Sequence, residues 1–185
     1  MNVDDPRVQR TRARLRAAIL DLSADHDLAD ITMSAVAKRA EINRATVYQH
    51  YPDLDSLVTD AMEDAMVRIV QAAGLCPFDA PRDVVPPPLA ELFEHVAAQA
   101  PLYARMLDAH GSARLAVGLR ERLTTELTRR FAEGNRPSGH GDVPVELHAA
   151  YLAGALCGVV AHWITAPRPR PAHETALAFW RLFRD

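Results

Sequence analysis

The side chains best suited to recognising another molecule lie in the stretch EINRATVYQHY, residues 41–51. Within it, a guanidinium could read the edge of a guanine with two parallel hydrogen bonds, and hydroxyl and amide groups could bind phosphate oxygens. The hydrogen-bonding residues are Arg44, Thr46, Tyr48, Gln49 and His50. Nothing in the stretch resembles a catalytic motif, so its residue types indicate binding rather than catalysis.

Basic residues gather near the N-terminus, although the whole chain carries a net charge of -3. Residues 7–16 contain five Arg and no acidic residue, and residues 6–50 contain eight basic and five acidic side chains. Such a local excess is a better indicator of nucleic-acid binding than net charge is. A solvated basic helix face would have the same composition, so the neighbouring motif has to decide between the two interpretations.

Length and composition indicate a soluble globular protein. The chain has 185 residues, of which 49% are hydrophobic and 24% charged, enough for one large core or two smaller ones. No run approaches the roughly 18 apolar residues that a membrane span needs, and the N-terminus lacks an apolar secretory segment. Cys76 and Cys157 are far apart, as is typical of a reduced compartment. We therefore expect a cytoplasmic protein with no membrane partner.

Helices must position the binding residues, because helical periodicity recurs along the chain and strand alternation does not. We therefore expect an all-α fold. Pro6 opens the first helix, Pro101 separates two helices, and the proline-rich segment CPFDAPRDVVPPP forms a loop. The expected helices, about nine in number, cover roughly residues 6–23, 33–40, 44–51, 53–69, 89–100, 102–109, 112–132, 144–164 and 172–183.

The two short helices on either side of the turn Glu41-Ile42-Asn43 have the pattern of a helix-turn-helix motif. Ala37 and Ala40 are small enough for the helices to cross closely, and Asn43 is a suitable N-cap for the second helix. The apolar contacts behind that helix come from Val36, Ile42 and Val47. Its outward residues are then free to enter the major groove of DNA.

The stretch ITMSAVAKRAEINRATVYQHYPDLDSLV, residues 31–58, resembles the N-terminal signature of the TetR family of bacterial transcriptional regulators. The matching positions are Thr32, Val36, Ala37, Ala40, Ile42, Thr46, Val47, Tyr48, His50, Tyr51 and Leu57. The resemblance covers about residues 10–62. It implies a three-helix DNA-binding domain over residues 6–66, with the motif at 32–51, and a ligand-binding and dimerisation domain over residues 67–185. The later segment YLAGALCGVVAHWI is similar to the subgroup that includes dihydroxyacetone-kinase regulators.

The resemblance also implies which residues contact double-stranded operator DNA. They are Thr32, Ser34, Arg44, Ala45, Thr46, Tyr48 and His50. Tyr48 and His50 would contact backbone phosphates, and Arg44 with Ala45 would read bases. Thr32 and Ser34 would contact a phosphate at the start of the second helix, where backbone amides favour anions.

Two residues depart from the family pattern. Glu41 stands where the family has a turn glycine, and Leu54 stands where it usually has a phosphate-binding lysine. Each change removes favourable electrostatics, and the loss of a phosphate contact lowers the salt dependence of binding. We expect the arginines of the first helix to make up part of this loss.

The resemblance implies a small-molecule effector that binds among the later helices and shifts a conformational equilibrium. The candidate pocket residues are His95, Tyr103, Met106, His110, Cys157, His162 and Trp163. For Met106 and Trp163 a plain core position is the stronger interpretation. A metal cluster of His95, His110, His148 and Cys157 has no supporting ligand spacing. We expect no metal, no cofactor and no catalytic site, since no catalytic motif is present.

The last two helices offer a surface for self-association. Gly154, Ala155, Gly158 and Ala161 keep one side of the long helix small. Leu177, Phe179, Trp180, Leu182 and Phe183 make the final helix apolar on more than one face. A monomer would expose that surface, so we expect a two-fold homodimer, which suits the two half-sites of a palindromic operator.

The leading hypothesis is therefore a transcriptional regulator, most simply a repressor that a small molecule releases from its operator. Two alternatives stay open. One is a helical protein-interaction module of the same fold whose DNA affinity is weakened by Glu41 and Leu54. The other is a helical-bundle enzyme or metal-binding protein that uses the His and Cys residues.

Overall fold

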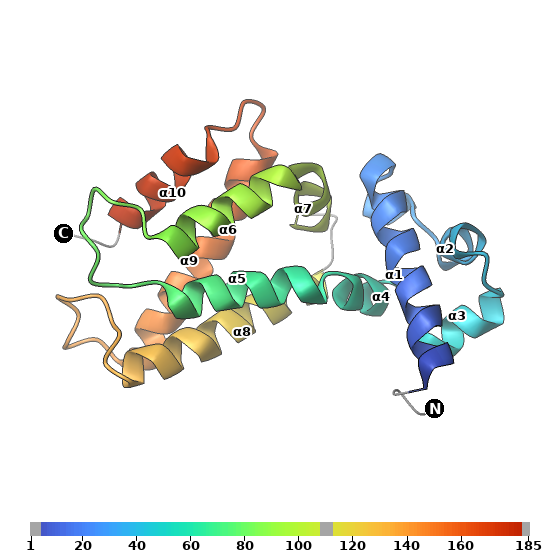
Figure 1. Cartoon of the computed structure of the whole chain (residues 1–185), viewed down its shortest axis with the longest axis horizontal. Coiled ribbons are helices and arrows are strands. Elements are labelled where there is room, and N and C mark those ends of the chain that lie inside the picture. The colour runs from blue at the N-terminus through green and yellow to red at the C-terminus, as the bar shows by residue number, and fades with distance from the viewer. Residues whose placement is uncertain (1–4, 108–112, 183–185) are drawn as a thin grey trace. The chain divides into compact units, whose positions relative to one another are not determined.

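The computed structural model describes residues 5–107 and 113–182, apart from the side chains of residues 101 and 105–107. This part of the chain contains ten α-helices, one short 3-10 helix and no strand, which confirms the expected all-α fold (Figure 1). The helices are α1 (Pro6–Asp25), α2 (Met33–Ala40), α3 (Arg44–His50), α4 (Leu54–Ala61), α5 (Glu63–Leu75), α6 (Pro87–Ala98), α7 (Ala100–Leu107), α8 (Ala113–Ala132), α9 (Val145–Thr165) and α10 (Ala172–Arg181), with the 3-10 turn at Leu28–Asp30.

The chain divides into two compact units. The N-terminal unit comprises Met1–Asp64 with Arg105–Leu115, and the C-terminal unit comprises Ala65–Ala104 with Ala116–Asp185. The N-terminal unit therefore contains α1 to α4, and the C-terminal unit contains α6, α9, α10 and most of α5 and α8.

In the N-terminal unit, α1 packs against both α2 and α4, and α2 packs against α3. Each of these helices has at least one fully buried apolar side chain in this core, among them Leu15, Val36, Val47 and Leu57. Burial of such a side chain contributes about 1.5–3 kcal/mol. The core thus holds short helices that would be marginal alone.

Side-chain caps fix where these helices begin. The Thr32 hydroxyl accepts from the amide of Ala35 at 3.1 Å, and the Asp53 carboxylate accepts from the amide of Ser56 at 2.7 Å. Asp5 caps α1 in the same way, through the amide of Arg7 at 2.8 Å. Each cap satisfies an amide that has no partner within its own helix.

The region expected to form one helix over residues 53–69 forms two, because the chain leaves helical geometry at Met62. This residue has φ -92° and ψ 3° and is buried. No Pro or Gly marks the break, and the apolar spacing continues across it, so periodicity alone does not reveal it. The two helices α4 and α5 account for the difference between nine expected helices and the ten of the described chain.

Pro101 does not separate two helices as expected. The break falls at Gln99, and Pro101 lies in the first turn of α7. A proline fits that position because the first amides of a helix have no carbonyl partner in any case.

The C-terminal unit has an aromatic core on α6, α9 and α10. The Phe93 ring lies 5.3 Å from that of Trp163 and 6.1 Å from that of Phe179 between centroids. Two indoles tie loops to this core. Trp180 Nε1 donates to the carbonyl of Pro81 at 2.9 Å, and Trp163 Nε1 donates to the carbonyl of Arg170 at 2.8 Å.

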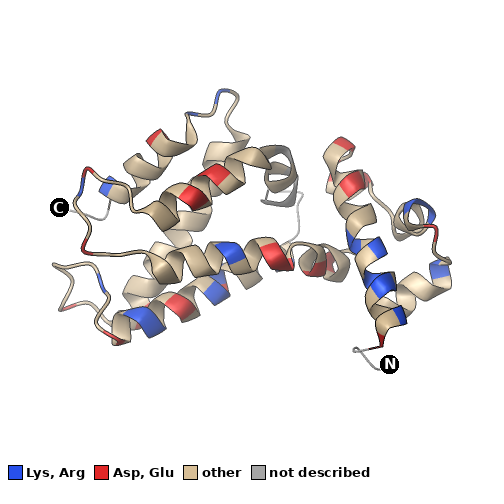
Figure 2. Cartoon of the chain, in the orientation of Figure 1, with Lys and Arg blue, Asp and Glu red and all other residues tan. Residues whose placement is uncertain are grey.

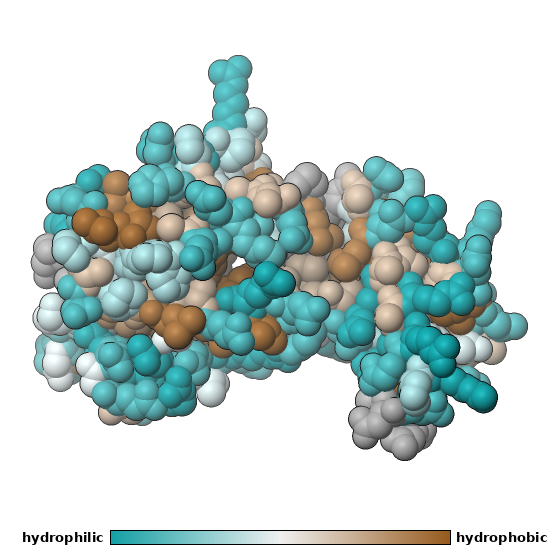
Figure 3. All heavy atoms as spheres, in the orientation of Figure 1, coloured by the Kyte–Doolittle hydropathy of each residue, from teal (hydrophilic) through white to brown (hydrophobic). Residues whose placement is uncertain are grey.

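Large exposed hydrophobic residues gather on the C-terminal unit. Of the eight in the described chain, seven belong to this unit: Val67, Leu75, Val84, Val117, Leu147, Tyr151 and Leu182. In the view of Figure 3, hydrophobic residues form separate patches on this unit among hydrophilic surroundings. This unit therefore has more apolar surface available to a partner than the N-terminal unit has.

Helix α9 is long and apolar enough, by length and composition, to cross a membrane. One side of it, including Ala149, Leu152 and Leu156, is buried within the C-terminal unit. A core helix of a helical bundle has the same length and hydropathy, and the burial of these residues fits that description.

Candidate nucleic-acid interface

The turn between α2 and α3 is held by backbone hydrogen bonds. The amide of Glu41 donates to the carbonyl of Lys38 at 3.2 Å, and the amide of Ile42 donates to the carbonyl of Ala37 at 2.9 Å. Asn43 then caps α3, because its side-chain oxygen accepts from the amide of Ala45 at 2.8 Å. This pattern ends one helix and starts the next within three residues.

Glu41 occupies a backbone conformation that normally favours glycine. Its φ of 53° and ψ of 45° are left-handed, and it is the one non-glycine residue with positive φ in the described chain. A side chain in this conformation costs roughly 1–2 kcal/mol. The Glu41 carboxylate lies 3.3 Å from Nη2 of Arg14 on α1, and both side chains are exposed.

Helix α3 presents one exposed face. Val47 is fully buried and anchors the helix, whereas Arg44, Ala45 and Tyr48 are exposed. The Arg44 guanidinium lies over the Tyr48 ring, 5.6 Å from its centroid. This cation–π contact joins residues four apart on one helix face and restricts the orientations of the guanidinium.

Thr46 and His50 lie at the edge of this face and are half-buried. His50 Nδ1 is buried and has no hydrogen-bond partner among the described residues. Burial, and then the nearby charge of Arg12, lower the pKa of His50 below its usual 6.5. A neutral ring can bind a phosphate through a hydrogen bond but not through a net charge.

The end of α3 is tied to α1 and α4 by a network that sequence reasoning missed. The Tyr51 hydroxyl donates to the Asp60 carboxylate. Arg12 donates from Nε to the Tyr51 hydroxyl at 3.1 Å and from Nη2 to Asp60 at 3.0 Å. Burial and the bond to Asp60 raise the pKa of Tyr51 to about 12. Because Tyr51 is 39 residues from Arg12, no local pattern signals the contact.

Basic residues lie along α1, in the last turn of α2 and at the start of α3 (Figure 2). Several of them already hold carboxylates. Arg12 and Arg16 pair with Asp60 at 3.0 and 3.8 Å, Arg14 pairs with Glu41, and Arg39 pairs with Asp21. Three of the five arginines of the first helix are therefore paired with carboxylates, which leaves less of their positive charge to compensate for Leu54.

Lys38, in the last turn of α2, and Arg44, in the first turn of α3, have no acidic partner among the described residues, and the same holds for Arg7 and Arg10 on α1. All four are exposed. Thr32 and Ser34, at the start of α2, are exposed as well.

Of the seven expected pocket residues, five have side chains that the structure describes. His95 and Tyr103 lie edge to face, with ring centroids 6.0 Å apart, but Trp163 packs on Phe93 in the aromatic core. Cys157 is half-buried and burial raises the pKa of its thiol to about 11, and His162 is exposed. His110 and the side chain of Met106 lie outside the described residues.

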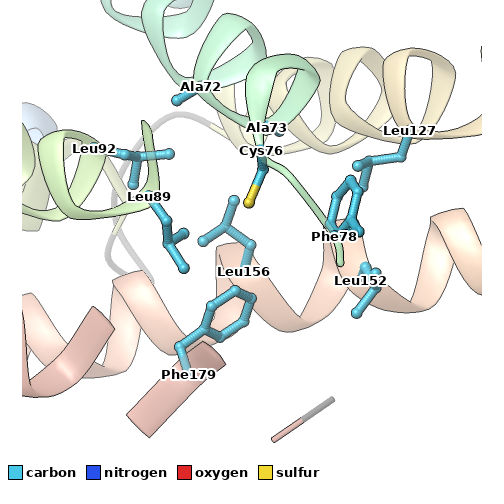
Figure 4. Close-up of a pocket in the computed structure, with 10 residues that line it drawn as sticks. All are labelled: Ala72, Ala73, Cys76, Phe78, Leu89, Leu92, Leu127, Leu152, Leu156 and Phe179. Carbon is cyan, nitrogen blue, oxygen red and sulfur yellow. The ribbon is translucent and has the colours of Figure 1, made fainter. Parts of the chain in front are cut away.

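Sequence reasoning also missed an apolar cavity inside the C-terminal unit. It is lined by Ala72, Ala73, Cys76, Phe78, Leu89, Leu92, Leu127, Leu152, Leu156 and Phe179 (Figure 4). These residues come from α5, α6, α8, α9, α10 and the loop after α5, so they are brought together only by the fold. In the sequence they resemble ordinary core residues.

No group of three or more His, Cys, Asp or Glu in the described chain is placed to hold a metal ion. His148, one member of the metal cluster considered above, is buried against other groups. Its Nδ1 accepts from Arg136 Nε at 2.9 Å, and its ring stacks on His140 with centroids 4.5 Å apart.

Part of this chain is similar to known regulatory proteins. Residues 15–61 match the family described as "Bacterial regulatory proteins, tetR family". A region of 67 residues is 37% identical to the uncharacterized HTH-type transcriptional regulator YxbF of Bacillus subtilis (strain 168). That region is 36% of this chain and 18% of YxbF, so the similarity spans less than a fifth of that relative.

Solved structures share the fold of nearly the whole chain. A TetR transcriptional regulator from Streptococcus agalactiae 2603V superposes with a TM-score of 0.70 at 18% identity, over 99% of this chain and 98% of that one. A tetR-family regulator from Streptomyces coelicolor gives 0.66 at 19% identity, over 95% and 79%. Thermus thermophilus FadR, a TetR-family repressor in complex with lauroyl-CoA, gives 0.63 at 19%, over 93% and 92%.

Proposed function

We propose that this chain, whose residues 15–61 match the tetR family of bacterial regulatory proteins, is a transcriptional regulator that binds double-stranded DNA through α3. The observation that carries this proposal is the exposed face of α3. There, Arg44 is free of acidic partners among the described residues and stacks on Tyr48. The family is regulatory, and we propose no catalytic activity for this chain.

Each exposed residue of the motif has a proposed role. Arg44 reads guanine through its two-pronged guanidinium, beside the small Ala45. Tyr48 and His50 bind backbone phosphates, the latter as a neutral hydrogen-bond donor. Thr46 also contacts DNA. Thr32 and Ser34 contact a phosphate at the start of α2, where unpaired amides favour an anion.

The regulator is proposed to act as a homodimer on two half-sites. Supporting this, Leu147 and Tyr151 on α9 and Leu182 after α10 are large, apolar and 61–72% exposed. A Cβ atom added at Gly154 or Gly158 would have no neighbour within 4 Å. The small side of α9 is therefore open to a second copy of the chain, and a two-fold pair suits a palindromic operator.

We further propose that the protein is cytoplasmic, that it is a repressor, and that a small molecule bound in the C-terminal unit releases it from DNA. The Thermus thermophilus repressor of similar fold is in complex with lauroyl-CoA, which supports ligand binding in this architecture. The apolar cavity of the C-terminal unit supports it independently. Residues 6–66 would be the DNA-binding domain and residues 67–185 the effector and dimerisation domain.

Fluorescence anisotropy with duplexes from the gene's own upstream region tests the proposal. Binding should be specific relative to a scrambled duplex and should weaken between 100 and 300 mM salt, because phosphate contacts release counterions. Arg44→Ala should weaken specific binding at least tenfold, about 1.4 kcal/mol, the lower part of the range for one bidentate base contact. Arg168→Ala removes the same charge from an exposed loop of the C-terminal unit and serves as the control.

A second function, a protein-interaction module with weakened operator binding, is favoured by Glu41 and Leu54. The Glu41 carboxylate forms an ion pair with Arg14, and the apolar side chain of Leu54 has no charge with which to bind a phosphate. Weak binding of equal strength to all duplexes, unaltered by Arg44→Ala, would support this function over the regulator.

A further inference from the structure

The loop that joins α8 to α9, residues 133–144, packs on a buried histidine of α9 (Figure 1). His148 lies near the start of α9 and is only 3% exposed. Its ring stacks on that of His140 in the loop, with centroids 4.5 Å apart, and lies 5.1 Å from that of Phe131 at the end of α8. Nδ1 of His148 accepts a hydrogen bond from Nε of Arg136, also in the loop, at 2.9 Å. One imidazole of α9 therefore contacts both the loop and the end of α8.

The hydrogen bond from Arg136 fixes the protonation state of this imidazole. A guanidinium only donates, so Nδ1 of His148 carries no proton and the ring is the neutral tautomer protonated at Nε2. Nε2 is buried and has no hydrogen-bond partner among the described residues. The charged or titratable groups that face the ring are Arg136 and His140, both from the loop, and Phe131 of α8 has no charge. A second proton would therefore place an imidazolium against the guanidinium and replace the acceptor by a donor.

Arg136 closes the loop through two hydrogen bonds. Besides the bond from Nε to His148, its Nη2 donates to the backbone carbonyl of Val143, just before α9, at 2.8 Å. The end of α8 is held separately, because the amide of Asn135 donates to the carbonyl of Arg130 at 3.0 Å. Loss of the Arg136 contacts would therefore open the loop without unwinding α8.

We propose that the α8–α9 loop is a proton-released latch in the C-terminal unit: neutral His148 holds Arg136 and the loop closed, and proton uptake by His148 frees Arg136 and opens the loop. The latch requires neither DNA nor an effector, so it stands apart from the proposed function.

The direction of the effect follows from the pKa of His148. In the closed loop, burial and then the charges of His140 and Arg136 lower this pKa to about 4. In an open, solvated loop it returns to about 6.5. The open form thus binds protons more tightly, so closure is fully favoured above pH 6.5 and this preference is lost as the pH falls towards 4.

Hydrogen–deuterium exchange at pH 7.5 and pH 5.0, corrected for intrinsic exchange rates, tests the latch. The reporter is the amide of Val143, which donates to the carbonyl of His140 in the closed loop at 3.2 Å. With the two pKa values above, the open fraction rises roughly 25-fold between these pH values, and exchange at Val143 should rise by the same factor. Amides of α9 between residues 152 and 160 should stay protected over the same times, which identifies a local opening.

Two variants separate the latch from a general effect of acid. His148→Gln keeps an acceptor for Arg136 but does not titrate, so exchange at Val143 should stay slow and change less than about threefold between the two pH values. Arg136→Met removes both hydrogen bonds, so exchange should be fast at both pH values. His173→Gln, the control, removes an exposed histidine of α10 and should retain the full effect of pH.

Nitrogen NMR of the wild-type protein tests the tautomer directly. At pH 7.5 His148 should be protonated at Nε2 and not at Nδ1. Protonation at Nδ1, slow exchange at Val143 in Arg136→Met, or an equal effect of pH on exchange in the wild-type protein and His148→Gln would each overturn the latch. If His148→Gln does not fold, the wild-type tautomer and the Arg136→Met exchange rates decide the question.

Discussion

At the residue scale, Glu41 combines two unfavourable features at the centre of the candidate interface. Its backbone is left-handed, and its carboxylate forms an ion pair with Arg14 in the region proposed to bind DNA. A glycine would adopt this conformation without a steric penalty. The residue therefore lowers both the stability of the turn and the positive charge available to DNA.

We predict that Glu41→Gly stabilises the protein by about 0.5–1 kcal/mol and tightens DNA binding. Relief of left-handed strain gives the first effect, and release of Arg14 gives the second. Urea unfolding and anisotropy measure the two. Glu41→Gln is the control, because it removes the charge but keeps a side chain at positive φ. It should tighten DNA binding without the gain in stability.

Also at this scale, His148 makes stability depend on pH. Burial, followed by the charges of His140 and Arg136, lowers its pKa to about 4, against about 6.5 in the unfolded chain. Between these values the unfolded state binds more protons, so stability is full above pH 6.5 and falls as pH drops towards 4. Within this window, a decrease of one pH unit lowers the free energy of unfolding by at most about 1.4 kcal/mol.

We therefore predict that the free energy of unfolding by urea decreases from pH 7.5 to pH 5, and that His148→Gln reduces this slope. Comparing slopes rather than absolute stabilities removes the packing cost of the substitution. His50 and His95, whose pKa values are also lowered, contribute to the slope of both proteins alike. Identical slopes in the two proteins would contradict the assignment to His148.

At the scale of elements, α3 is held in place by the contacts of Tyr51 with Arg12 and Asp60. Asp60→Asn should destabilise the protein by about 1–3 kcal/mol, because it leaves the Arg12 guanidinium without its carboxylate. It should also weaken DNA binding, since α3 is then less firmly fixed. Asp30→Asn alters an exposed carboxylate and should cost less than 0.5 kcal/mol. Equal stabilities of the two variants would contradict this role of the network.

Local signals explain which elements the sequence could predict. Asn43 caps α3, Val47 anchors it, and small alanines allow α2 to approach, so the helix-turn-helix could be predicted from adjacent residues. The break at Met62 could not, because no Pro or Gly interrupts the apolar spacing. The hydrogen bond between Arg12 and Asp60 joins residues 48 positions apart in the sequence. The residues that line the apolar cavity come from five helices and a loop. Both features depend on tertiary packing, so local sequence patterns do not predict them.

At the scale of the whole molecule, the proposed regulator needs a second copy. Gly154→Leu places a bulky side chain on the open, small side of α9, and we predict that it converts the dimer into a monomer. Light scattering coupled to gel filtration measures the mass. Gly118→Leu, which adds the same side chain where a Cβ also has no neighbour, is the control and should remain dimeric. A wild-type monomer, or a dimeric Gly154→Leu variant, would contradict this interface.

The most direct test of the central claim is the anisotropy titration of wild-type protein and Arg44→Ala with the upstream duplex and its scrambled counterpart. The proposed function predicts that the wild-type protein prefers the upstream duplex, and that Arg44→Ala loses this preference while Arg168→Ala keeps it. Equal affinity of the wild-type protein for both duplexes, unchanged by Arg44→Ala, would contradict it.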